Sequence, residues 1–393
     1  MDIGALGARW KGQTILLDKK LLRNFDYTLM ITVLLIIAYG LVILSSATHI
    51  TMGKGGDQFA FVKKQLSSVI IGLVFIGGLF TINYSDLAKY TKFFYVLNVI
   101  LLIAVKIFGS TAKGAQSWIK LGPVNFQPSE VAKVLVIITF AAYLVNHQGK
   151  LNSFKDLIPS FVHFGIPMLL ILAQPDLGTA LVFTAIFFGM LFVAGANPKV
   201  LVAIIMAGAI MVGSVLYGQL ALGWEKPLKQ YQAKTLTVFA DLYQDARGAG
   251  YHVIQSQVAI GSGGAWGKGL YRGTQNQLNF LPEQQTDFIF SVVGEELGFA
   301  GVSALLLLFF ILVYRGIRIA ADSRDMFGTL LATGIVSMIV FHLLVNIGMA
   351  AGIMPITGIP LPLFSYGGSS MMANLIAIGL LININLRRQK LMF

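Results

Sequence analysis

Long apolar segments constrain the fold of this chain more than any other feature of its sequence. Of its 393 residues, 56% are apolar and only 12% are charged, about half the charged share of a soluble domain. A run of about 20 apolar residues can cross a bilayer as a helix. The sequence therefore predicts an all-α polytopic membrane protein with ten spans, at about 28–47, 66–83, 93–109, 127–146, 158–174, 177–195, 199–217, 287–315, 327–350 and 368–386.

Basic residues divide unequally between the two sides of this predicted bundle. With a cytoplasmic N-terminus, sixteen Lys and Arg residues fall in cytoplasmic segments and six in short external loops. This positive-inside bias predicts that both termini are cytoplasmic. The net charge of +12 then reflects membrane topology and not nucleic-acid binding. The chain has no cysteine, which excludes disulfides, thiol catalysis and zinc–thiolate sites.

The predicted spans divide the chain into five regions. They are a cytoplasmic segment at 1–26, seven helices over 27–217, a large extracytoplasmic loop at 218–286, three helices over 287–386 and a cytoplasmic tail at 387–393. A loop this long is usually functional or disordered. Its segment GWEKPLKQYQAKTLTVFADLY has an amphipathic pattern typical of a membrane interface. We therefore expect an ordered layer over the bundle.

Ionisable residues inside membrane spans are costly and are functional candidates for that reason. Glu130 and Lys133 lie three residues apart and share a helix face, with Gln127 one turn earlier. One interpretation is an ion pair that fixes helix packing, because buried charges are usually paired. The other is that Lys133 positions a carboxylate or a phosphate.

A second polar set lies at the start of the span predicted over 287–315. Asp287, Ser291 and Glu295 are spaced by four residues, which predicts one polar stripe along an interior cleft. The alternative is that Asp287 only caps the N-terminus of the helix. The spacing alone does not separate the two.

Other polar or glycine-rich segments carry weaker signals. GSGGAWGKGL, Gly261 to Leu270, either presents N–H groups to a phosphate beside Lys268 or only forms turns. The Gly- and Pro-rich segment 346–370, which includes Ser365 and Ser369, predicts backbone that lines a cavity. His342 and Asn346 share a helix face as packing hydrogen-bonders, and Asp176 fits a turn or cap.

Several segments together resemble one family. They are GAQSWI, FQPSEVAK, QPDLGTA, QSQVAIGSGG, FLPEQQTDFIFSVVGEELGF and PLPLFSYGGSS. The chain resembles the SEDS membrane proteins of rod-shape maintenance, division and sporulation, over essentially all ten spans. The segment GTQNQLNFLPEQQTDFIF resembles the rod-shape (RodA) branch.

The resemblance implies an activity and partners. SEDS proteins polymerise lipid II, a lipid-linked disaccharide-pentapeptide, into peptidoglycan glycan strands outside the membrane. Their usual partner is a class B penicillin-binding protein, here within the elongation machinery. A lipid II flippase, an FtsW-like division polymerase and a noncatalytic scaffold are the alternatives.

The family motifs also assign residues. The essential aspartate falls on Asp287, the QPSE-x-x-K motif on Gln127, Ser129, Glu130 and Lys133, and the GA-x-x-W tryptophan on Trp118. Two positions depart from the family pattern: Ser117 stands where many members carry Arg, and Asn125 stands where some members carry a basic residue.

The reaction that the resemblance implies needs two kinds of group. A general base must take a proton from the attacking sugar hydroxyl, and we expect Asp287 to do so. The departing lipid pyrophosphate needs charge neutralisation. Lys133, Lys268, Arg272 or a divalent cation such as magnesium or manganese can supply it, and the sequence leaves the cofactor open.

Overall fold

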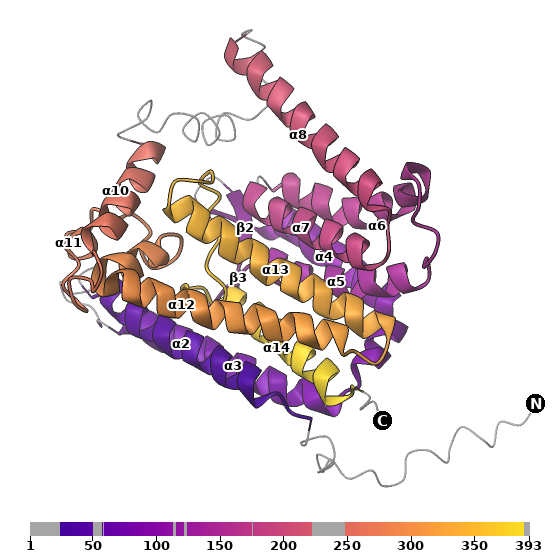
Figure 1. Cartoon of the computed structure of the whole chain (residues 1–393), viewed down its shortest axis with the longest axis horizontal. Coiled ribbons are helices and arrows are strands. Elements are labelled where there is room, and N and C mark those ends of the chain that lie inside the picture. The colour runs from indigo at the N-terminus through magenta and orange to yellow at the C-terminus, as the bar shows by residue number, and fades with distance from the viewer. Residues whose placement is uncertain are drawn as a thin grey trace, which may run out of the picture.

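The described part of the chain is a bundle of membrane-spanning helices with a small sheet at one end (Figure 1). The computed structural model describes residues 24–49, 57, 59–112, 115–121, 124–174, 176–221 and 248–388. Its helices are α2 (Tyr27–Ala47), α3 (Ala60–Thr81), η2 (Tyr84–Tyr90), α4 (Thr91–Phe108), α5 (Pro128–Val145), α6 (Phe154–Leu172), α7 (Leu177–Val193), α8 (Pro198–Ala221), α10 (Ala249–Ser262), α11 (Thr274–Gln277), α12 (Ile289–Ala321), α13 (Met326–Ala350) and α14 (Gly368–Leu386).

Each of the ten predicted spans coincides with a helix, which confirms the fold class. Within the described ranges, nine helical segments are long and apolar enough to cross a membrane, and the tenth span, α7, is shorter at 17 residues. The three-stranded antiparallel sheet between α4 and α5 was not expected. It comprises β1 (Ser110–Ala112), β2 (Ala115–Leu121) and β3 (Val124–Phe126).

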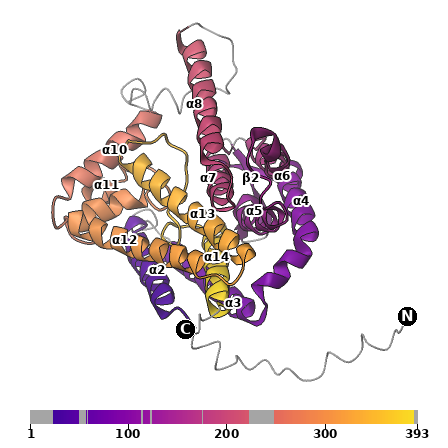
Figure 2. The same ribbon diagram turned by 45° about the vertical axis from the view of Figure 1, so that its right-hand side comes forward.

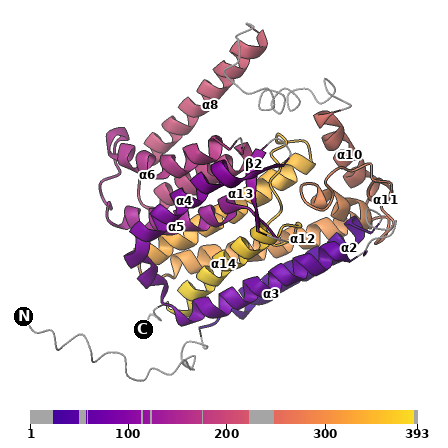
Figure 3. The ribbon, with the colours of Figure 1, turned by 180° about the vertical axis from the view of Figure 1, so that it is seen from behind.

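The helices differ sharply in how deeply they are buried. In α5 and α14, 83% of the spanning window is inside the protein, against 6% in α8. Accordingly α8 projects away from the bundle (Figures 1 and 2). Seen from behind, α3 runs along α14, and Gly72 lets the two helices approach because its position faces Leu375 (Figure 3). Close packing at small residues is the usual way that membrane helices associate.

The two described ends of the chain meet at one end of the bundle. The side chain of Asn385 donates to the carbonyl of Asn24 at 2.8 Å. Nearby, Arg315 of α12 donates to the buried carboxylate of Asp26, which also caps α2. This end lies about 40 Å along α12 from its first residue, Ile289, at 1.5 Å per residue. Residues near the start of α12 therefore lie at the opposite end of the bundle.

A break at Gly298 divides α12 into two helical parts. Gly298 has φ 63° and ψ −159°, a conformation restricted to glycine. The glycine cluster after α10 packs against this break and pairs with its free backbone groups. The N–H groups of Phe299 and Ala300 donate to Gly264 and Ala265, and those of Lys268 and Gly269 donate to Glu295 and Glu296. The cluster therefore serves the helix break, and the interpretation as structural turns is the one that the geometry supports.

The predicted large loop is described in part. α8 extends to Ala221, four residues beyond its predicted end, and the amphipathic segment GWEKPLKQYQAKTLTVFADLY lies outside the described residues. The remainder of the loop contains α10 and α11.

Replacing Gly298 with alanine should destabilise the protein. A Cβ at Gly298 would lie 2.3 Å from the amide nitrogen of Gly267, and the backbone conformation disfavours any side chain. We expect the free energy of unfolding to fall by at least about 2 kcal/mol, measured by denaturation in detergent. Gly208→Ala in α8 is the matched control, because no atom lies within 4 Å of a Cβ there. Equal stability of the two variants would contradict this account of the break.

Candidate active site

A cavity of about 450 Å³ lies at the end of the bundle opposite the described chain ends. Its lining comes from β2, α5, the α6–α7 turn, α7, α13, the α13–α14 connection, the start of α14 and the segment before α12. The residues that carry its chemistry are Trp118, Gln127, Glu130, Lys133, Asp176, Asp287, His342 and Tyr366. Sequence motifs from distant parts of the chain therefore meet at one site.

Asp287 lies on the cavity wall, half-buried and two residues before α12 begins at Ile289. Its Oδ2 faces Gly358, where a Cβ would lie 3.7 Å from it. α12 begins only at Ile289, and neither Ser291 nor Glu295 lines the cavity that Asp287 faces. The expected stripe of Asp287, Ser291 and Glu295 along one helix face is therefore wrong.

Three side-chain or backbone donors hold the chain at Asp287. The carbonyls of Gln285, Thr286 and Asp287 accept in turn from the Tyr366 N–H at 2.9 Å, Ser365 Oγ at 2.7 Å and Asn346 Nδ2 at 3.0 Å. We call these three donors the carbonyl clamp. Ser365 Oγ also accepts from the Leu361 N–H at 2.9 Å, so it joins the α13–α14 connection to the segment that contains Asp287.

Ser291 and Glu295 lie outside the cavity and make a separate buried network. Ser291 Oγ lies 2.6 Å from Ser256 Oγ of α10. Glu295 is fully buried and accepts from Lys268 Nζ at 2.7 Å and from the Gln275 N–H at 2.9 Å. Lys268 is therefore paired with Glu295, and neither Lys268 nor the exposed Arg272 lines the cavity.

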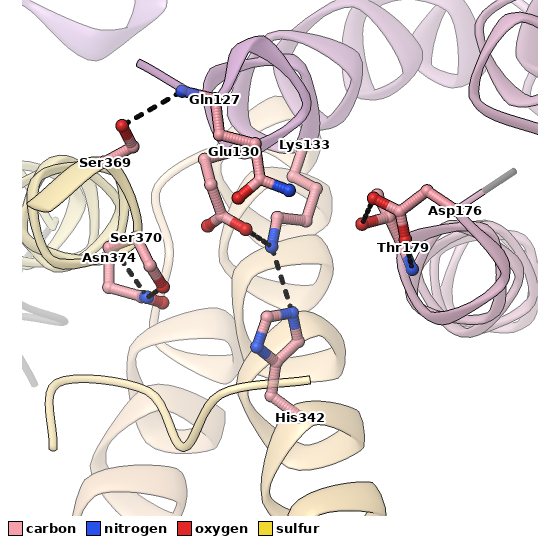
Figure 4. Close-up of polar contacts among 9 residues, drawn as sticks. All are labelled: Gln127, Glu130, Lys133, Asp176, Thr179, His342, Ser369, Ser370 and Asn374. Carbon is pink, nitrogen blue, oxygen red and sulfur yellow. Dashed lines mark hydrogen bonds and ion pairs between the residues drawn. The ribbon is translucent and has the colours of Figure 1, made fainter. Parts of the chain in front are cut away.

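Glu130 and Lys133 form an ion pair on the cavity wall (Figure 4). Lys133 Nζ donates to Glu130 Oε1 at 2.9 Å and lies 3.1 Å from His342 Nε2, with both members of the ion pair at most 3% exposed. An ammonium group has no lone pair, so Nε2 is the acceptor in that contact. Within the described residues Glu130 Oε2 has no hydrogen-bond partner and lines the same cavity. Both proposed roles of the pair, packing and ligand contact, are compatible with this geometry.

The remaining motif residues have distinct positions. Ser369 Oγ accepts from the Gln127 N–H at 3.1 Å and donates to the Asn125 carbonyl at 3.2 Å, which fixes the start of α5 against α14 (Figure 4). Trp118 presents its ring to the cavity from β2. Ser129 is buried and does not line it.

Sequence reasoning assigned no functional role to two groups of the cavity lining. Asp176 caps α7, as expected, accepting from the Thr179 N–H at 2.9 Å, but it also faces the cavity. Burial raises the pKa of Asp176, and the hydrogen bonds from Thr179 oppose that rise. His342 also lines the cavity, and Asn346, one helical turn later, lies behind the lining; both are hydrogen-bonders, as expected.

Comparisons with known proteins identify the family of this chain. The family model described as "Cell cycle protein", which covers FtsW, RodA and SpoVE, matches residues 26–390. The chain belongs to this family. It is 36% identical over 369 residues to "Peptidoglycan glycosyltransferase MrdB" of Escherichia coli strain K12, covering 94% of this chain and 95% of that protein.

Two solved structures share the fold. One, described as "Structural coordination of polymerization and crosslinking by a peptidoglycan synthase complex", has a TM-score of 0.78 at 30% identity and covers 92% of this chain and 97% of its own. The other is the rod-shape-determining protein RodA of Thermus thermophilus, with a TM-score of 0.67 at 28% identity and coverage of 93% and 98%. The chain is therefore a RodA-like member of its family along almost its whole length.

Removing one charge of the Glu130–Lys133 pair should lower the free energy of unfolding more than removing both charges. Lys133→Met leaves Glu130 buried without its cation, and we expect the free energy of unfolding to fall by about 3–5 kcal/mol. The double variant Glu130→Gln/Lys133→Met should recover most of that loss, because no charge stays buried. Denaturation of the wild type and the two variants in one detergent makes the comparison. A double variant less stable than Lys133→Met would contradict mutual neutralisation.

Proposed function

We propose that this protein polymerises lipid II into peptidoglycan glycan strands during cell elongation, with Asp287 as general base. The observation that carries the proposal is the single cavity in which Asp287, the Glu130–Lys133 pair and Trp118 face the same space. The names of the relatives support the activity, and the GTQNQLNF segment supports the elongation role over division.

The reaction is a single displacement at the anomeric carbon of the donor sugar. A hydroxyl oxygen of the acceptor sugar attacks the anomeric carbon of the donor, and the bond from that carbon to the undecaprenyl pyrophosphate oxygen breaks. The pyrophosphate leaves with the electron pair, and the hydroxyl proton passes to the Asp287 carboxylate. A single carboxylate suffices for such an inverting step, whereas glycoside hydrolysis uses two.

The charge of the cavity lining limits how the pyrophosphate is neutralised. Three carboxyl side chains, Glu130, Asp176 and Asp287, face one lysine, Lys133, which is already paired. Lys268 and Arg272 lie elsewhere, so neither supplies the charge in this arrangement. The protein side chains therefore supply little positive charge to neutralise the departing pyrophosphate.

A divalent cation would add the missing charge. Carboxylate and phosphate oxygens are the ligands that magnesium prefers, and it is often held by one or two carboxylates plus the phosphates of the substrate. Within the described ranges, no group of three or more His, Asp and Glu side chains is close enough to hold a metal ion. The residues therefore fit a cation bound jointly with the pyrophosphate, with Asp287 or Glu130 as its protein ligand.

The proposal includes location and partners. We propose cytoplasmic termini and an Asp287 cavity on the outer side of the cell membrane, and the positive-inside bias over ten spans supports this orientation. A class B penicillin-binding protein is the proposed partner, in line with the peptidoglycan synthase complex that shares this fold. The long prenyl tails of both substrates remain in the bilayer while their head groups meet beside Asp287.

Polymerisation by the Asp287→Asn variant tests this function. The amide cannot take the proton, so we expect glycan strand formation from purified lipid II to fall by about 10²- to 10⁴-fold. The assay uses the chain with its penicillin-binding partner, and lipid II binding is measured in parallel. Asp322→Asn is the matched control, because Asp322 lies at the other end of α12.

Two results would overturn the proposal in different ways. Equal polymer from Asp287→Asn and wild type would remove Asp287 from the chemistry. No polymer from the wild type, with lipid II transported across vesicles instead, would favour a flippase. Neither polymer nor transport would favour a scaffold.

A further inference from the structure

Asn346 makes an unusual pair of contacts between two walls of the cavity. It lies on α13 and is fully buried. Its Nδ2 donates one hydrogen bond to the Asp287 carbonyl at 3.0 Å and another to the Ile359 carbonyl at 2.8 Å. Both hydrogens of one amide group are therefore used to join two irregular segments.

Those two segments are the ones that face each other at the Asp287 carboxylate. Ile359 directly follows Gly358, and a Cβ at Gly358 would lie 3.7 Å from Oδ2 of Asp287. The segment that contains them connects α13 to α14 and is not helical, and Asp287 precedes α12. The Asp287 N–H is bonded within its own segment, to the Glu283 carbonyl at 3.1 Å, whereas the Asp287 carbonyl is bonded outside that segment, to Asn346. The distance between the carboxylate and this wall is therefore set by side-chain contacts such as those of Asn346.

The other members of the carbonyl clamp do not duplicate Asn346. Ser365 Oγ donates to the Thr286 carbonyl and the Tyr366 N–H donates to the Gln285 carbonyl. These two donors belong to the segment just before α14. Asn346 belongs to α13, which is 56% buried over its spanning window. It alone in the clamp ties Asp287 to this membrane helix.

The same face of α13 also positions the cation of the cavity. His342 lies one helical turn before Asn346 and accepts from Lys133 Nζ. One rigid helix face therefore contacts both the Asp287 backbone and the Lys133 ammonium. This arrangement fixes the two charged groups relative to each other.

We propose that Asn346 is a positioning residue that holds the Asp287 carboxylate at its working distance from the Gly358–Ile359 wall. The inference rests on the proposed function. Catalytic steps depend steeply on geometry, since a misplacement of about 1 Å can cost about 100-fold in rate. Loss of the amide should therefore reduce kcat and leave the KM for lipid II nearly unchanged.

The chain contains a matched control for the buried amide. Asn383 of α14 is 1% exposed, and its Nδ2 likewise donates to two carbonyls, those of Leu79 and Ile82. It lies 15 residues into α14, roughly 20 Å from the start of that helix near the cavity. Asn383→Ala removes the same two donated hydrogen bonds far from Asp287, together with the acceptor that Arg387 Nη1 uses at 2.6 Å.

The experiment compares Asn346→Ala with Asn383→Ala. We expect the melting temperature to fall in both variants, because each loses two hydrogen bonds from a buried amide to backbone carbonyls. We expect kcat for polymerisation to fall at least 10-fold in Asn346→Ala and less than 2-fold in Asn383→Ala, with KM within 2-fold in both. If Asn346→Ala does not fold, Asn346→Ser, which keeps one donor, should show an intermediate loss of kcat.

Equal kcat in the two variants, or a change confined to KM in Asn346→Ala, would overturn the proposal. The rate of amide hydrogen exchange in the segments around Asp287 and Gly358 tests the Asn346 contacts without relying on polymerase activity. It therefore distinguishes failure of this inference from failure of the proposed function. If the wild type makes no polymer, faster exchange there in Asn346→Ala than in Asn383→Ala would still support the tether. Equal exchange would overturn it.

Discussion

Backbone polar groups inside a membrane protein must find partners within the protein, and the cavity of this chain depends on that requirement. Besides the helices α5, α7 and α13, its walls include two non-helical segments, one before α12 and one between α13 and α14. Gln65 of α3 meets part of the need, since its amide donates to the Ser365 carbonyl and accepts from the Gly367 N–H. With the carbonyl clamp, buried side chains from three helices or connections hold the non-helical backbone around Asp287. A polar cavity is therefore stable where regular structure is interrupted.

The same requirement explains how charge is distributed in the bundle. Buried ions inside the described bundle have close partners: Lys133 with Glu130 and His342, Lys268 with Glu295, and Arg315 with Asp26. The pairs at Lys268 and Arg315 stabilise the helix break and the opposite end of the bundle. Only the Glu130–Lys133 pair faces the cavity. The pair supplies a polar surface there with no net charge. Neutralisation of the substrate pyrophosphate therefore needs a positive charge other than Lys133, such as a divalent cation bound with the substrate.

The membrane helices could be predicted from sequence because apolar length is a local property. The contents of the cavity required long-range information. The spacing of Asp287, Ser291 and Glu295 suggested one stripe, but α12 begins only after Asp287, and Ser291 and Glu295 pack against α10 and its following loop. The glycine cluster had two local interpretations, and only the break at Gly298 shows which backbone groups it serves. Motif resemblance singled out Asp287, Glu130, Lys133 and Trp118 as candidates, and the fold brings them to one cavity.

Site-specific photo-cross-linking to lipid II tests the central claim, that the head group of the substrate occupies the Asp287 cavity. A photoreactive residue is placed at Ile356 in the cavity lining, or at Leu307, which is 58% exposed on the outer surface of α12. The label is carried on the disaccharide, so contacts of the prenyl tail are not counted. The account predicts capture of labelled disaccharide at Ile356 and not at Leu307. Capture at Leu307 with none at Ile356 would contradict it.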